Sequence, residues 1–276
     1  MKQQAVRQYM IEALEGFEER ERNNVISYYI DAKQAEILSN SLAFQQLAAD
    51  VKALNKGEPV QYVTGISFFY GHRFCIRPGC LIPRPETEEL VHWIIEDRRR
   101  LDALKILDIG VGSGCILLSV VSALENRGID VGGFGLDISP AAIEVFNENK
   151  KRIGVGAQAI IGDIRSDLDL PMVNVIVSNP PYILDEEKAR MDASVLTYEP
   201  PEALFVEGSD PLVYYKRVME LGKTFLLPGG VIYFETSDLY HTELSEAIDE
   251  QTYSPEFRKD LNGSWRMLKL TKHQLS

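Results

Sequence analysis

From Leu104 onward, short apolar runs alternate with segments of helical periodicity, and this alternation constrains the fold more than any other feature of the chain. The apolar runs predict strands at 105–109, 133–137, 157–161, 173–178 and 231–235. Helical patterns follow at 116–125, 140–152, 211–226 and 240–250. Because consecutive parallel strands need a crossover connection, repeated strand–helix units predict an α/β fold with helices on both faces of a parallel sheet.

The last part of the chain departs from this alternation. Two strand-like runs, 256–261 and 265–270, flank Asn262-Gly263, and Asn-Gly is a strong signal for a tight antiparallel hairpin. A parallel sheet that is closed by an antiparallel hairpin is the layout of the Rossmann-like methyltransferase sheet. We expect residues 85–276 to form a domain of this kind.

The first part of the chain has a different texture. Residues 1 to about 60 carry helical patterns and almost no strand signal. Residues 61–81 are rich in aromatic and β-branched types and are broken by Gly65, Gly71 and Pro78-Gly79. The sequence thus predicts a small helical-bundle domain over 1–64, followed by a β-hairpin or linker over 65–84.

A glycine-rich turn, Gly110-Val111-Gly112-Ser113-Gly114, follows the first apolar strand of the sheet and precedes a helix. Glycine allows the backbone to turn sharply and to approach a ligand closely. The dinucleotide fingerprint needs a further glycine at position 115, which is Cys115 here. Asp108, at the strand end, repels a phosphate but can neutralise a cationic amino acid or a sulfonium. This pattern favours S-adenosyl-L-methionine as the cofactor.

Acidic residues also end the second and third strands of the sheet. Asp137 can accept hydrogen bonds from both ribose hydroxyls of a nucleoside. Asp163 can accept from the exocyclic amine of adenine, and the next residue, Ile164, can pack on the ring. A lone Asp in a loop usually caps a turn, but the ordered set of strand-end acids around a glycine turn predicts a cofactor site.

The fourth strand is followed by Asn179-Pro180-Pro181-Tyr182. Asn and Pro are common in turns, but this turn falls at the edge of the sheet where α/β proteins bind ligands. An amide or aromatic-amine nitrogen is a poor nucleophile because its lone pair is delocalised. The Asn179 side-chain oxygen and the Pro180 carbonyl can each accept one N–H of such a group, and Tyr182 offers a ring face. The motif predicts N-methylation of a planar amide or amine.

With these motifs, the chain resembles the release factor glutamine methyltransferases, the HemK-like family. The resemblance extends from Glu58 and includes three further segments, 58–65, 82–88 and 198–204. It implies methyl transfer to the glutamine of the Gly-Gly-Gln loop in class 1 peptide chain release factors. It also implies that Gly110 to Gly114, Asp137, Ile164 and Asn179 contact the cofactor.

The same resemblance places Asn179 to Tyr182 on the substrate glutamine and Arg84 beside the site. Arg84 can alternatively act only as a strut between domains. The helical N-terminus matches the size and type of the family's substrate-recognition domain. Three local departures, Glu235 followed by Thr236-Ser237, Val111 and Pro211, affect loop shape and partner contacts more than the reaction class.

Two other functions stay open at this point. An adenine-amine methyltransferase of DNA or RNA could use the same Asn-Pro-Pro-Tyr motif, although it must flip the base and grip a phosphate backbone. The formal net charge of −12 disfavours a nucleic-acid partner. A non-catalytic binding protein on the same fold is the second alternative, but such a protein is expected to lose one of the two motifs.

Composition limits the location and the partners. The apolar runs are strand-sized, which disfavours a membrane span, and the N-terminus lacks the pattern of a signal peptide. The three cysteines form no C-x-x-C pair, and the four histidines are scattered, so we expect no metal site and a reducing compartment. We expect a cytoplasmic monomer.

Overall fold

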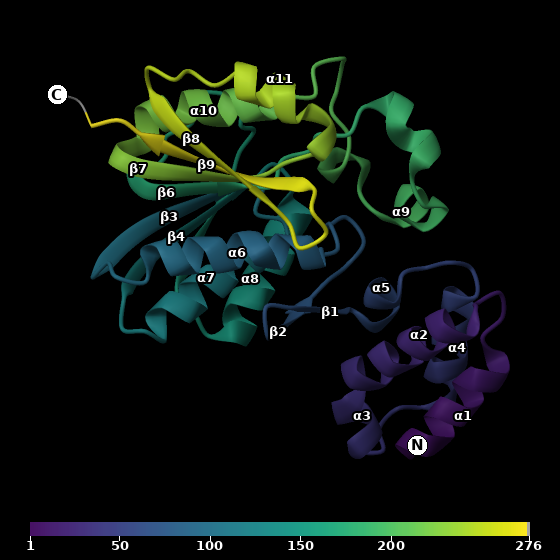
Figure 1. The fold of residues 1–276 in the computed structure, drawn as a ribbon. Coiled ribbons are helices and arrows are strands. Elements are labelled where there is room, and N and C mark those ends of the chain that lie inside the picture. Colours follow the sequence, from purple (N-terminus) through teal and green to yellow (C-terminus); the bar gives the residue numbers. More distant parts are fainter. Residues whose placement is uncertain (275–276) are drawn as a thin grey trace.

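Five helices at the N-terminus pack around an apolar core of their own (Figure 1). The computed structural model describes residues 1–274, so the last two residues of the expected 85–276 domain lie outside it. The helices are α1 (Gln3–Ala13), α2 (Glu19–Ala32), α3 (Gln34–Leu38), α4 (Phe44–Leu54) and α5 (Val60–Thr64). Val6, Met10 and Leu47 are fully buried in this core, as expected for the apolar faces of amphipathic helices. The predicted helical region is confirmed.

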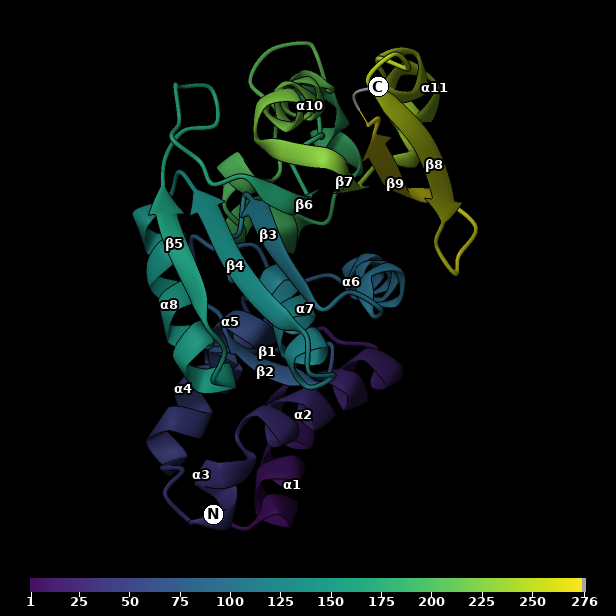
Figure 2. The same cartoon turned by 90° about the vertical axis from the view of Figure 1, so that its left-hand side faces the viewer.

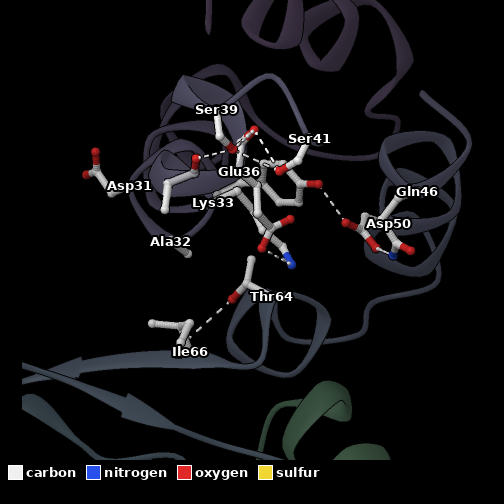
Figure 3. A network of polar contacts seen from close by, with 12 residues as sticks. Asp31, Ala32, Lys33, Glu36, Ser39, Ser41, Gln46, Asp50, Thr64 and Ile66 are labelled. Atoms are coloured by element: carbon white, nitrogen blue, oxygen red, sulfur yellow. Dashed lines mark hydrogen bonds and ion pairs between the residues drawn. The ribbon is translucent and has the colours of Figure 1, made fainter. Parts of the chain in front are cut away.

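A buried carboxylate, Asp50, joins α2 to α4 inside this group of helices. It accepts hydrogen bonds from the Tyr29 hydroxyl and from the Gln46 side-chain amide, each at 2.6 Å (Figure 3). The same view shows Ser39 and Ser41, whose hydroxyls bond each other near the end of α3. Because Asp50 has these partners, both of its buried carboxylate oxygens are hydrogen-bonded.

A short antiparallel hairpin connects the helices to the sheet. It consists of β1 (Ile66–Phe69) and β2 (His72–Cys75), which confirms the expected hairpin. Arg73 of β2 donates to the carbonyl oxygens of Asp31 and Ala32 at the end of α2, at 2.9 and 2.5 Å. These bonds satisfy carbonyls that a helix end leaves free and fix the hairpin against α2.

One buried asparagine fixes the other side of the hairpin. Asn149 lies on α8 (Pro140–Ile153) and is completely inaccessible to solvent. Its Oδ1 accepts the Cys75 N–H at 2.6 Å, while its Nδ2 donates to the carbonyls of Cys75 and Ser113, both at 2.9 Å. A single side chain therefore bonds both the hairpin and the glycine-rich turn.

The rest of the chain is built on a seven-stranded sheet, whose strands lie in the order β5-β4-β3-β6-β7-β9-β8 (Figure 2). The strands are β3 (Ala103–Ile109), β4 (Asp130–Asp137), β5 (Ala157–Ile161), β6 (Val173–Ser178), β7 (Leu226–Glu235), β8 (Tyr253–Lys259) and β9 (Trp265–Lys272). The first five strands in chain order pair in parallel, and β9 pairs antiparallel with both β7 and β8. The predicted parallel sheet with an antiparallel end is confirmed.

Helices cover both faces of this sheet (Figure 2). One face packs against α6 (Pro85–Arg98), α7 (Cys115–Glu125) and α8. The other packs against α10 (Val213–Phe225) and α11 (His241–Glu246). Between β6 and α10 the chain forms three short helices, η1 (Asp185–Arg190), α9 (Ala193–Tyr198) and η2 (Pro201–Ala203). The central strands are therefore buried on both sides, which explains their continuous apolar runs.

The expected elements agree with the observed ones except at some ends. The strands at 157–161 and 173–178 are confirmed to the residue. β4 begins at Asp130, three residues earlier than expected, because Gly132 and Gly133 interrupt the apolar pattern without ending the pairing to β3. The helix expected over 240–250 is wrong at its end, since α11 stops at Glu246 and a turn precedes β8.

The connection between β8 and β9 also differs from the expectation. In place of a two-residue Asn-Gly turn, a loop of residues 260–264 joins the strands. The Asp260 carboxylate accepts the N–H groups of Asn262 and Ser264 at 3.0 and 2.9 Å, and it pairs with Arg266 Nε at 3.1 Å. Since an Asp side chain can replace backbone partners in this way, the strand ends at Lys259 and the loop widens.

In the described part of the chain, none of the helices combines the length and the apolar character that crossing a membrane requires.

Candidate functional site

A cavity opens at the carboxyl ends of the parallel strands, where ligands bind in open α/β sheets. It encloses about 950 Å³ of empty space, a figure that includes space open to solvent. Each of four strands contributes the residue that ends it or follows it: Gly110 after β3, Asp137 of β4, Gly162 after β5 and Asn179 after β6. The cavity therefore gathers residues that lie far apart in the sequence.

The glycine-rich turn forms one wall of the cavity. Gly110, Gly112 and Gly114 have φ angles of 76°, 53° and 80°, a region that other residues adopt only with strain. Gly110 and Gly112 line the cavity, whereas Val111, Ser113 and Gly114 do not. A Cβ on Gly114 would lie 2.6 Å from Phe146 Cδ2, so this glycine is required for the packing of α7 against α8.

Asp108 lies beneath the turn and does not line the cavity. Its Oδ2 accepts the Leu117 N–H at 3.3 Å, while Oδ1 is buried without a hydrogen-bond partner among residues 1–274. Burial raises the pKa of Asp108 to about 8, because removing a carboxylate from water disfavours its charge. A positively charged cofactor in the cavity would favour the ionised form of this carboxyl group and lower its pKa.

Asp137 connects the turn to the end of β4. Its two carboxylate oxygens accept the N–H groups of Gly112 at 2.8 Å and Ser139 at 2.9 Å. Burial raises the pKa of Asp137, and these N–H donors oppose the shift. Each carboxylate oxygen can accept more than one hydrogen bond, so Asp137 can hold the turn and still receive ribose hydroxyls.

Two isoleucines and an acid form the far end of the cavity. Ile138 and Ile164 both line it, and Ile138 is 54% exposed. Apolar side chains of this size can pack against the face of a planar base. Asp163 lines the same region, and the Arg165 guanidinium beside it lowers its pKa. The Arg165 guanidinium Nη2 lies 3.0 Å from Asp163 Oδ2, and the Arg165 backbone N–H donates to Asp163 Oδ1 at 2.8 Å. An adenine amine that bonds Asp163 would have to share it with Arg165.

The Asn-Pro-Pro-Tyr motif divides between the cavity and the core. Asn179, Pro180 and Pro181 line the cavity, whereas Tyr182 does not and packs partly buried against α10 and the sheet. Burial raises the pKa of Tyr182 to about 12, so its phenol stays protonated at neutral pH. The motif thus places two amide-type oxygen acceptors, Asn179 Oδ1 and Pro180 O, on residues at the cavity wall.

Arg84 does not line the cavity. Its Nη2 lies 2.6 Å from Oε1 of Glu199, whose side chain is 1% exposed, and Glu199 Oε2 accepts the Ile82 N–H at 3.2 Å. The contact joins the linker to the segment after α9. This arrangement agrees with the strut alternative for Arg84.

Several cavity residues were missing from the sequence-based site: Cys80, Ile138, Ser139, Glu202 and Tyr214. Ile138 had a usable signal, since it directly follows the strand-end acid Asp137. Cys80 and Glu202 come from segments whose path over the sheet no local pattern specifies. Among residues 1–274, no cluster of His, Cys, Asp or Glu has the arrangement that a metal ion needs.

Sheet order, glycine turn and cavity together define a Rossmann-like methyltransferase. Residues 88–223 match the family described as "Methyltransferase small domain". A methyltransferase from Pyrococcus furiosus has the same fold, with a TM-score of 0.53, 16% sequence identity and coverage of 74% of this chain and 90% of its own.

Curated relatives narrow the class further. A release factor glutamine methyltransferase from Bacteroides thetaiotaomicron is 37% identical over 236 residues, which are 84% of this chain and 83% of the relative. One from Flavobacterium psychrophilum is 38% identical over 222 residues, covering 79% of this chain and 76% of the relative. The chain belongs to the release factor glutamine methyltransferase family.

Proposed function

We propose that the chain transfers a methyl group from S-adenosyl-L-methionine to the side-chain amide nitrogen of the glutamine in the Gly-Gly-Gln motif of class 1 peptide chain release factors, in the cytoplasm. One observation carries the proposal: Asn179 and Pro180 line the same cavity as Gly110, Gly112 and Asp137. A group that recognises a planar amide therefore faces the same space as groups suited to a nucleoside. The names of the curated relatives support the choice of substrate.

The cofactor would occupy the part of the cavity next to the glycine turn. The backbone at Gly110 and Gly112 admits a close approach, Asp137 would accept from the ribose hydroxyls, and Ile138 and Ile164 would enclose the adenine. The partnerless Asp108 oxygen beneath the turn suits a ligand with positive charge. When bound, S-adenosyl-L-methionine supplies an electrophilic methyl group.

The substrate amide would enter beside Asn179. Its two N–H groups would donate to Asn179 Oδ1 and Pro180 O, which holds the nitrogen in place and directs its lone pair toward the methyl carbon. The cofactor would supply the methyl group, and the amide nitrogen that accepts it would afterwards lose a proton to solvent. Tyr182 would support the motif from behind, since its ring packs against the sheet.

We also propose that the chain divides functionally at 1–64, 65–84 and 85–276, with the first part recognising the release factor. The Tyr198 hydroxyl of α9 donates to the Lys56 carbonyl at 3.1 Å, so the turn after α4 contacts the segment that follows the Asn-Pro-Pro-Tyr motif. A partner bound to the helices would thus lie near the cavity.

The test is incubation with labelled S-adenosyl-L-methionine and an unmodified release factor, beside the same factor with its Gly-Gly-Gln glutamine changed. Label on the first factor alone is the expected result. Asn179→Ala should lower kcat on the order of 100- to 1,000-fold, as for loss of a preorganised polar group. Label on DNA or RNA in place of the factor would support adenine-amine methylation, and failure to bind the cofactor would support a non-catalytic role.

A further inference from the structure

Asn179 and Glu235 stand side by side at the carboxyl ends of two neighbouring strands. β6 and β7 pair in parallel with Val177 opposite Tyr233 and Ser178 opposite Phe234, so the next residues along each strand are Asn179 and Glu235. Asn179 lines the cavity, whereas Glu235 does not and is only 3% exposed. Glu235 therefore lies on the buried side of Asn179, away from the cavity.

Neighbouring groups hold the Glu235 carboxylate in place. The Thr87 hydroxyl, at the start of α6, donates to Oε2 at 2.5 Å. The Tyr215 hydroxyl donates to the Glu235 backbone carbonyl at 3.0 Å. Arg266 contributes positive charge nearby and is itself fixed to Asp260 at 3.1 Å. A buried carboxylate with these partners has a defined position and orientation.

Asn179 lies one residue beyond Ser178 on the neighbouring strand, and its side chain also favours the ionised form of this carboxylate. An ionised carboxylate only accepts hydrogen bonds, whereas a primary amide has a donating NH₂ end and an accepting oxygen end. A carboxylate beside Asn179 therefore selects one of the two amide orientations. In that orientation Nδ2 faces Glu235, and Oδ1 faces away from it.

We propose that Glu235 is a positioning residue that accepts a hydrogen bond from Asn179 Nδ2 and thereby presents Asn179 Oδ1 to the substrate nitrogen. This inference rests on the proposed function for its catalytic consequence. The reverse amide orientation would direct an N–H at the substrate N–H, and a donor that faces a donor cannot bind it. Glu235 acts through Asn179 without contact to the substrate.

The proposal predicts an acid-sensitive step. Burial raises the pKa of Glu235, while Thr87, Arg266 and Asn179 favour the ionised form and Glu86 opposes it. The other titratable groups around the carboxylate are Tyr182, Tyr215 and Cys115. As the pH falls through the raised pKa, Glu235 gains a proton, becomes a donor and stops selecting the productive amide orientation. Turnover by the wild-type enzyme should therefore decline on the acidic side.

The kinetic test compares Glu235→Gln, Asn179→Ala and the double variant, using a release factor as substrate. Glu235→Gln should lower kcat on the order of 10- to 100-fold, as expected for a misplaced catalytic group, leave the Kd for the cofactor unchanged and remove the acidic limb of the kcat profile. In the Asn179→Ala background it should add less than about a twofold loss, because coupled groups are not additive. Glu256→Gln, on the hairpin strand β8, is the matched control and should retain full activity.

A measurement without substrate separates this inference from the proposed function. In the wild-type protein, NMR should show the Asn179 side-chain NH₂ protons shifting with pH together with the Glu235 carboxyl carbon. This result supports the pairing even if no release factor is methylated. The proposal is overturned if the Asn179 NH₂ signals do not follow the titration of Glu235. It is also overturned if the activity losses of the two single variants multiply in full in the double variant.

Discussion

The Arg84 guanidinium and the Glu199 carboxylate form an ion pair, with Nη2 2.6 Å from Oε1, across 115 positions of sequence. The Glu199 side chain is 1% exposed and the Arg84 side chain 33%. Because the pair fastens the linker to the segment before η2, it fixes two parts of the chain that flank the cavity.

This pair yields a stability prediction. Arg84→Ala should lower the free energy of unfolding by about 2 kcal/mol, less than the ~3–5 kcal/mol of a fully buried pair because Arg84 is partly solvated. Urea unfolding of Arg84→Ala, Glu199→Ala and the double variant measures the coupling. Arg77→Ala, which breaks an exposed pair with Glu148, is the control and should cost under about 1 kcal/mol. Unchanged stability with a raised KM for the release factor would instead mean that Arg84 contacts substrate.

A second prediction concerns the glycine turn. Gly114→Ala forces both a positive φ and a Cβ 2.6 Å from Phe146 and 2.8 Å from Leu118, so it should cost roughly 3–5 kcal/mol of stability. Gly128 has nearly the same φ of 82° but nothing within 4 Å of an added Cβ. Gly128→Ala should therefore cost only about 1–2 kcal/mol. Equal urea midpoints for the two variants would show that the close contacts with Phe146 and Leu118 do not lower the stability of Gly114→Ala.

A third prediction follows from the buried carboxyl Asp108. Its pKa is about 8 in the folded chain against 3.8 for the ordinary group, so the folded state holds a proton that the unfolded state has lost. The wild-type stability should therefore fall as pH rises from about 4 to 8, by up to roughly 1.4 kcal/mol per pH unit.

Asp108→Asn removes this titration, so the variant should gain stability over the wild type as pH rises and gain little near pH 4. Urea unfolding at several pH values measures the difference. The exposed Asp167→Asn should follow the wild-type curve and serves as the control. Parallel curves for Asp108→Asn and the wild type would contradict the raised pKa.

The fourth prediction tests the end of the cavity where the adenine is proposed to bind. Ile138→Ala removes an exposed apolar side chain that a bound base would cover, and it should raise the Kd for S-adenosyl-L-methionine on the order of 10-fold. Ile161, 61% exposed at the end of β5, lies outside the cavity. Ile161→Ala should leave the Kd unchanged in calorimetric titration. Equal Kd values for both variants would remove Ile138 from the site.

The sheet was predictable because its signals are local. The strand β6 ends at Ser178 where the apolar run ends, and a buried parallel strand needs continuous apolar residues. The loop around Asp260 was not predictable, since Asn262-Gly263 gives the signal of a shorter turn. The outcome depends on one carboxylate that accepts two N–H groups and one guanidinium.

The candidate site also has a part that the sequence predicts and a part that it does not. Gly110, Asp137 and Asn179 carry signals within a few residues of a strand end, and all three line the cavity. The contact between Thr87 and Glu235 spans 148 positions and exists only because α6 begins over the end of β7. No spacing or composition rule can predict such a contact before the fold is known.

The three hydrogen bonds of Asn149 limit how freely the parts of this enzyme could be exchanged. One amide bonds the hairpin strand at Cys75 and the glycine turn at Ser113. A chimera that received its N-terminal segment from another protein would need a strand with the same backbone position opposite Asn149. Without it, the turn that faces the cavity would lose the shared anchor, so the N-terminal helices can be swapped only together with the hairpin that carries them.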